Sequence, residues 1–145
     1  MRALINLTSS QDQLDAIQRL AEILKPGGYL VFLENFESAH ESQNRMRQIL
    51  GLEPRKQAEY NIFMNEASVI SKLKNLGLED IRVLNYSGLH DMLLYVLLPQ
   101  LNEGKIDYSD PLVHLSAKLT SSLELDQMNN LGSFGQNRLV LARKP

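Results

Sequence analysis

The stretch LKPGGYLVFLEN, residues 24–35, restricts the fold of this chain more than any other part of the sequence. Pro26 and the two glycines after it end the helix that is predicted before them. Five apolar residues follow at once, and such a short apolar run with a helix on either side is typical of a central strand covered on both faces. The stretch therefore predicts an α/β fold whose sheet contains a strand at 29–34.

The rest of the chain fits the same class of fold. Apolar residues recur at helical spacing after Ser9 or Ser10, either of which can act as the N-cap, and predict a helix over about 10–24. Similar patterns predict the remaining elements, which are helices at 37–50, 66–76, 89–101 and 110–123 and strands at 80–87 and 137–143. Three strands make a thin sheet, so the order of elements suggests a piece of a larger doubly wound fold.

The composition limits the possible functions. A length of 145 residues predicts a single domain over 1–145, and a net charge of -2 argues against a nucleic-acid partner. The absence of cysteine excludes disulfides and thiolate chemistry, and it fits a cytoplasmic protein. No apolar run approaches the roughly 18 residues of a membrane span. The three histidines do not have the spacing of metal ligands, so no metal site is expected.

Several segments resemble one family. LKPGG and the strand after it resemble the fifth-strand region of class I S-adenosylmethionine-dependent methyltransferases, and so does RALINLTSSQDQLDAI before it. Further along, five more segments resemble one subgroup of that family, which is often found near bacterial glycan and capsule genes. These segments are NRMRQILGL (44–52), YNIFMNE (60–66), NYSG (85–88), YSDPLVHLSAKL (108–119) and LGSFGQNRLVLARK (131–144). The resemblance covers nearly the whole chain.

The resemblance implies a partial Rossmann-like methyltransferase fold. The three strands would be strands five to seven of the full fold, in a mixed sheet with flanking helices, and the last strand would run antiparallel between the other two. It also implies S-adenosylmethionine as cofactor, with Leu4 and Asn6 as candidate cofactor contacts, and methyl transfer to a small-molecule or glycan-linked acceptor.

One feature of the family is missing from these residues. The eight glycines include no G-x-G-x-x-G turn, which would let the backbone approach the cofactor. By the family pattern, the first four strands would lie before Met1. We therefore expect the acceptor-binding, C-terminal half of the fold, inactive as an isolated chain. The alternative is a non-catalytic binding or interaction module that a partner chain or a homodimer completes.

Polar residues at the strand ends are the first candidates for the acceptor pocket. In open α/β sheets, ligands bind beyond the carboxyl ends of the strands. Glu34 and Asn35 end the first predicted strand, while Tyr86 and Ser87 end the second. We expect all four to bind substrate, with Glu34 also a candidate catalytic residue. The other interpretation is that Glu34 caps the next helix or pairs with an arginine on it.

Other candidates lie on helices and loops. Asn44 and Arg47 are three residues apart on one helical face, where an arginine fork could bind a carboxylate or phosphate or could simply be solvated. Tyr60 and Asn61 precede a helix and either line the acceptor pocket or form a turn. His90 is a candidate general base, and the alternative is that this histidine has a purely structural role.

The predicted strand at 29–34 raises the question of partners. Without a fourth strand it would be an apolar sheet edge, which proteins usually cover. We therefore expect a homodimer or a partner chain on this side. Alternatively, residues 1–8 fold back as a substitute strand. In the turn before the last strand, Gly135 is expected at positive φ.

Overall fold

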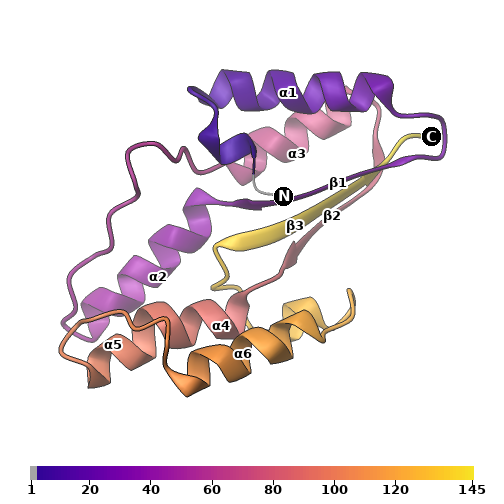
Figure 1. Cartoon of the computed structure of the whole chain (residues 1–145). Coiled ribbons are helices and arrows are strands. Elements are labelled where there is room, and N and C mark those ends of the chain that lie inside the picture. The colour runs from indigo at the N-terminus through magenta and orange to yellow at the C-terminus, as the bar shows by residue number, and fades with distance from the viewer. Residues whose placement is uncertain (1–2) are drawn as a thin grey trace. The chain divides into compact units, whose positions relative to one another are not determined.

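The computed structural model describes residues 3–145, and Figure 1 labels its helices and strands. The order of elements is a 3₁₀ turn Leu4–Asn6, α1 Ser10–Ile23, β1 Tyr29–Asn35, α2 Glu37–Ile49, α3 Glu66–Asn75, β2 Glu79–Asn85, α4 Gly88–Met92, a π-helical segment Leu93–Leu97, α5 Leu98–Leu101, α6 Pro111–Ser121, a 3₁₀ turn Met128–Leu131 and β3 Asn137–Arg143. The predicted helices and strands are confirmed, with ends that differ by a few residues. The helix predicted over 89–101 is divided into α4, the π-helical segment and α5.

The three strands form one sheet in the order β1-β3-β2. Hydrogen bonds join Gly27 and Gly28, just before β1, to Lys144, just after β3, and Tyr86, just after β2, donates to the carbonyl of Asn137. Both hydrogen-bonded pairs are therefore antiparallel, and β1 and β2 point in the same direction on either side of β3. The central, reversed β3 was predicted. The description of the sheet as mixed is wrong, because no two parallel strands are neighbours.

The chain divides into two compact units. The first contains the residues up to Glu37 together with Gln57–Val83 and Arg138–Pro145, and thus α1, α3 and most of the sheet. The second contains Ser38–Lys56 and Leu84–Asn137, and thus nearly all of α2 and the helices α4 to α6. The single domain expected from the length stays a prediction.

The first unit has an apolar core on one face of its sheet. Leu30 and Phe32 alternate with more exposed neighbours along β1, and they pack with residues of α1, α3 and β3: Ile17, Ala21, Val69, Leu73, Val140 and Ala142. On the other face of β1, Tyr29 is 58% and Val31 53% exposed. The prediction of a central strand is therefore wrong, because β1 is an edge strand of the sheet, and the prediction that it is covered on both faces is wrong for its first half.

The helices of this unit begin at side-chain caps. Ser9 accepts a hydrogen bond from the Asp12 amide and caps α1, while Asn65 accepts from the Ser68 amide and caps α3. Within residues 3–145, no helix has both the length and the apolar character that a membrane crossing requires.

The N-terminal segment does not form the substitute strand that was considered. Residues Leu4–Asn6 form a 3₁₀ turn, and the amides of Ala3 and Leu4 both donate to Oε1 of Glu34 at 2.8 Å. The alternative is therefore wrong for residues 3–8. Met1 and Arg2 lie outside the described residues.

Candidate functional site

Helix α2 carries a polar stripe in the second unit. His40, Gln43, Asn44 and Arg47 recur at the spacing that places side chains on one helical face. Gln43 is fully buried, and Arg47 is only 5% exposed. Glutamine and arginine are rarely buried unless they have hydrogen-bonding partners. The stripe therefore defines a polar centre, whose partners decide what it can do.

The stripe fixes the segment that follows α2. Asn44 Oδ1 accepts from the Arg55 amide at 2.8 Å, and its Nδ2 donates to the Arg55 carbonyl at 3.0 Å. Arg47 Nε donates to the Glu53 carbonyl at 2.7 Å. Asn44 and Arg47 thus share a face, as predicted, and the solvated alternative is wrong for the buried Arg47. Apart from His40 Nε2, which lies 3.2 Å from Asn44 Nδ2, their partners are backbone groups, and these bonds fix the backbone at Arg55.

The guanidinium of Arg55 lies over an aromatic ring. Its central carbon is 3.4 Å from the centroid of the Tyr95 ring, a cation–π arrangement. Nη1 donates to Oε1 of Gln43 at 3.1 Å and to Oε1 of Gln136 at 3.3 Å. Three neutral groups therefore hold the planar fork in one orientation.

Tyr95 lies in the π-helical segment, and its carbonyl also has a partner outside the helix. Pro99, four residues later, has no N–H to donate to that carbonyl. Arg47 Nη1 donates to it instead, at 2.5 Å. Burial is the main cause that raises the pKa of the Tyr95 phenol far above its usual value, so the hydroxyl stays neutral beside Arg55. Arg47 and Arg55 therefore both contact Tyr95.

Asp91 is a buried acid in the same unit. Its Oδ2 accepts from the Ser87 hydroxyl and from the Gln136 amide, both at 2.7 Å. Burial raises the pKa of Asp91, while the two hydrogen bonds act in the opposite direction. The predicted site residue Ser87 thus belongs to this cluster and connects it to the start of β3 through Asn137, which donates to its hydroxyl.

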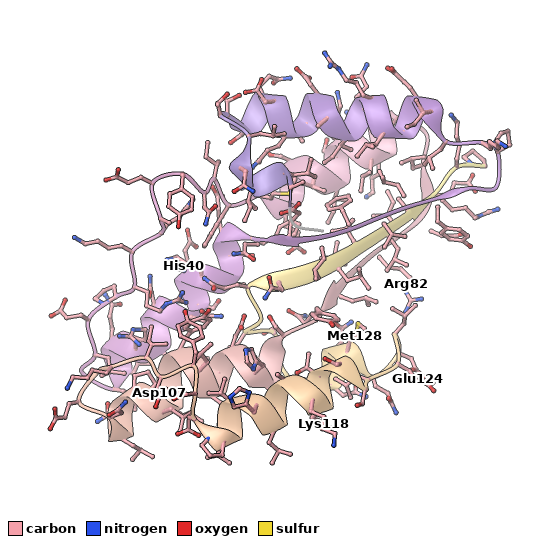
Figure 2. All side chains as sticks on the ribbon, viewed as in Figure 1. His40, Arg82, Asp107, Lys118, Glu124 and Met128 are labelled. Atoms are coloured by element: carbon pink, nitrogen blue, oxygen red, sulfur yellow. The ribbon has the colours of Figure 1, made fainter. Side chains whose placement is uncertain are left out.

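His40, on α2 (Figure 2), closes the network. Its Nδ1 lies 2.7 Å from Gln136 Nε2, and its Nε2 lies 3.1 Å from the Arg55 carbonyl. This arrangement assigns the acceptor role to Nδ1 and the donor role to Nε2. Burial first, and then the charge of Arg55, lower the pKa of His40, so the neutral ring is favoured near pH 7.

Gly135 lets the segment before β3 approach the start of α4. It is not among the glycines at positive φ, so that prediction is wrong; Gly132 has the positive φ of 88°. A Cβ on Gly135 would lie 2.8 Å from the backbone nitrogen of Gly88 and 2.9 Å from the carbonyl carbon of Ser87. Close packing of two backbones therefore requires glycine here and brings the Gln136 amide to Asp91.

Two further predicted residues lie in the second unit. His90 Nδ1 is 3.1 Å from the Ser116 hydroxyl of α6. Tyr86 is half-buried, and its amide continues the pairing of β2 with β3.

Arg47 also lines an open groove of about 550 Å³, in which the positive charge of Lys105 is balanced by the negative charges of Glu53 and Glu103.

The other predicted residues lie in the first unit. Glu34 is buried and holds the N-terminal 3₁₀ turn by its Oε1, in place of the helix cap or arginine pair that was considered; its Oε2 has no hydrogen bond within residues 3–145. Leu4 belongs to the apolar core and Asn6 is exposed. The remaining three are Asn35, which is buried, Asn61, which is half-buried, and Tyr60, which is 78% exposed.

Sequence reasoning missed most of the polar centre. Arg55, Asp91, Tyr95 and Gln136 lie in different segments, and no short motif joins them. The available signal was the spacing of the α2 stripe, of which only Asn44 and Arg47 were singled out. Among the described residues, no group of three or more histidine, aspartate and glutamate side chains could hold a metal ion.

The comparisons with known proteins add no identification. No family model matches the chain, and no curated protein matches it.

Proposed function

We propose that this chain is the acceptor-binding half of an S-adenosylmethionine-dependent methyltransferase, acting on a small-molecule or glycan-linked acceptor. The observation that carries the proposal is the strand order β1-β3-β2 with an antiparallel central β3. The resemblance of the sequence implies this order for strands five to seven of the family fold. The cytoplasmic location expected from the composition is part of the same proposal.

In this function, the second unit supplies the acceptor site. Catalysis by methyl transfer depends mostly on positioning of the acceptor, with a base where the acceptor must lose a proton. The network of Arg55, Tyr95 and Gln136 provides fixed polar groups for positioning. His90 remains the candidate base in this unit. S-adenosylmethionine supplies the methyl group, and Leu4 and Asn6 are the candidate contacts to it.

The proposal is tested by calorimetric titration of S-adenosylmethionine. We expect no saturable heat at micromolar concentration and no turnover with the 145-residue chain, because these residues include no Gly-rich cofactor turn. A longer chain that adds such a turn in frame before these residues is expected to bind the cofactor. An extended chain that carries the turn and still fails to bind would contradict the proposal, as would tight binding by the 145 residues alone.

A second candidate is an interaction module, and exposed apolar residues of the first unit favour it. Tyr29 and Val31 lie on β1, an edge strand, and Ile23 at the end of α1 is 78% exposed. A homodimer or a partner chain on this side would bury roughly 1,200 Å² or more in total. Light scattering over a dilution series tests the homodimer. A monomer at every concentration would contradict the homodimer, and a partner chain would then be the remaining form of this candidate.

A further inference from the structure

The charge on Arg55 is held in place without an acidic hydrogen-bonding partner. Its contacts are the Tyr95 ring and the amide oxygens of Gln43 and Gln136, all of which are neutral. Within residues 3–145, its guanidinium makes no ion pair within 4.0 Å. A cation fixed by neutral groups keeps its full attraction for an anion from outside.

One edge of this guanidinium is open. Both of its side-chain hydrogen bonds use Nη1, and within the described residues Nε and Nη2 have no hydrogen-bonding partner. Neither Nε nor Nη2 is fully buried. Nε and Nη2 together form the parallel pair of donors with which arginine binds carboxylate or phosphate.

The surrounding charges also favour an anion. Arg47 is buried, and burial first, then the positive charge of Arg55, lower its pKa. The buried acid Asp91 accepts hydrogen bonds from Ser87 and Gln136. Burial raises the pKa of Asp91 and so works against its charged form, whereas the charge of Arg55 is among the causes that lower this pKa. A bound anion would relieve the repulsion between the two guanidinium groups.

We propose that the open Nε–Nη2 edge of Arg55 binds an oxyanion, a carboxylate or phosphate group carried by a small molecule. Tyr95, Gln43 and Gln136 are positioning residues, because they fix the plane of the fork before the anion arrives. Binding of an oxyanion by Arg55 does not depend on the proposed function. Only the further step, that this oxyanion is part of the methyl acceptor, rests on that function. It therefore narrows the acceptor class to acidic molecules.

Binding is measured with inorganic phosphate and with acetate, each against chloride at matched ionic strength and without S-adenosylmethionine. The readouts are the thermal midpoint and the ¹⁵N-resolved NMR signal of the Arg55 Nε–H group. We expect a saturable rise of the midpoint and a saturable shift of that signal. The preference between the two probes tells phosphate from carboxylate.

Arg55→Gln is expected to weaken binding at least tenfold, and Arg55→Lys to weaken it less, because lysine keeps the charge but loses the fork. Arg45→Gln is the matched control, since Arg45 lies on the exposed side of α2 and donates a hydrogen bond to the Ser42 hydroxyl. Circular dichroism checks that each variant is folded.

Three results would overturn the inference: no saturable response to either probe in the unmodified chain, an equal loss in Arg45→Gln, or a shift of the Nε–H signal no larger than that in chloride. Because the cofactor is absent from these titrations, such a failure would leave the proposal of methyl transfer standing. A failure of the cofactor titrations would likewise leave the oxyanion site in place.

Discussion

The centres of the two units are built on opposite principles. In the first, Leu30 and Phe32 of β1 are buried among other apolar side chains. In the second, Gln43 and Arg47 are buried among amides, carbonyls and a second arginine. Apolar burial has no preferred direction, whereas each buried polar group needs a partner at the correct angle. The second unit should therefore tolerate less change in shape, and substitutions in the two units should differ in kind.

The largest effect is expected in the apolar core. Phe36 is fully buried in it, and Phe36→Ala is expected to lower the free energy of unfolding by about 3–5 kcal/mol through lost burial and a cavity. Urea denaturation measures this value. Val31→Ala, at a site 53% exposed, is the control and should cost much less. Similar losses in both variants would mean that the exposed face of β1 is buried in solution.

A methyl group at Gly135 tests the close packing in the second unit. Gly135→Ala should cost about 1–3 kcal/mol, because the new Cβ would meet backbone atoms of Ser87 and Gly88 that cannot rotate away. Ser133→Ala, at an exposed neighbouring site, should stay within about 0.5 kcal/mol. The measurement is again urea denaturation. An unchanged stability in Gly135→Ala would show that the approach of the two backbones is looser than described.

Replacing a buried amide by an apolar group separates the two principles. Gln43→Leu should destabilise the chain by about 1–2 kcal/mol, because the carbonyl of Phe134 loses its donor and Arg55 loses an acceptor. The same change at the exposed Gln48 on α2 provides the control and should be nearly neutral. A gain of stability in Gln43→Leu would mean that the polar centre behaves like an ordinary core.

The smallest effect concerns the pH dependence of stability. Because burial raises the pKa of Asp91 above its usual value, the folded state holds this proton more tightly than the unfolded state. Its contribution to stability is thus greatest below pH 4 and declines as the pH rises towards the folded pKa, by at most about 1.4 kcal/mol per pH unit. Asp91→Asn should lack this decline in urea denaturation at several pH values. Parallel curves for the two proteins would contradict the raised pKa.

The first unit was largely predictable from the sequence. The LKPGG turn, the apolar run of β1 and the caps at Ser9 and Asn65 are local signals, and each is found where the sequence places it. The polar centre was not predictable in the same way. Arg55 and Tyr95 are 40 residues apart, and their contact depends on the path of the segment after α2. Gln136 enters the network only because Gly135 allows two backbones to meet.

The bond between Arg47 and the Tyr95 carbonyl has a consequence for how related sequences can diverge. Pro99 has no N–H to offer to that carbonyl four residues later, and Arg47 Nη1 donates to it. A substitution of Pro99 restores a backbone donor and relaxes the requirement for arginine at position 47. Among homologues, positions 47 and 99 should therefore change together, although they are separated by 52 residues and lie on different helices.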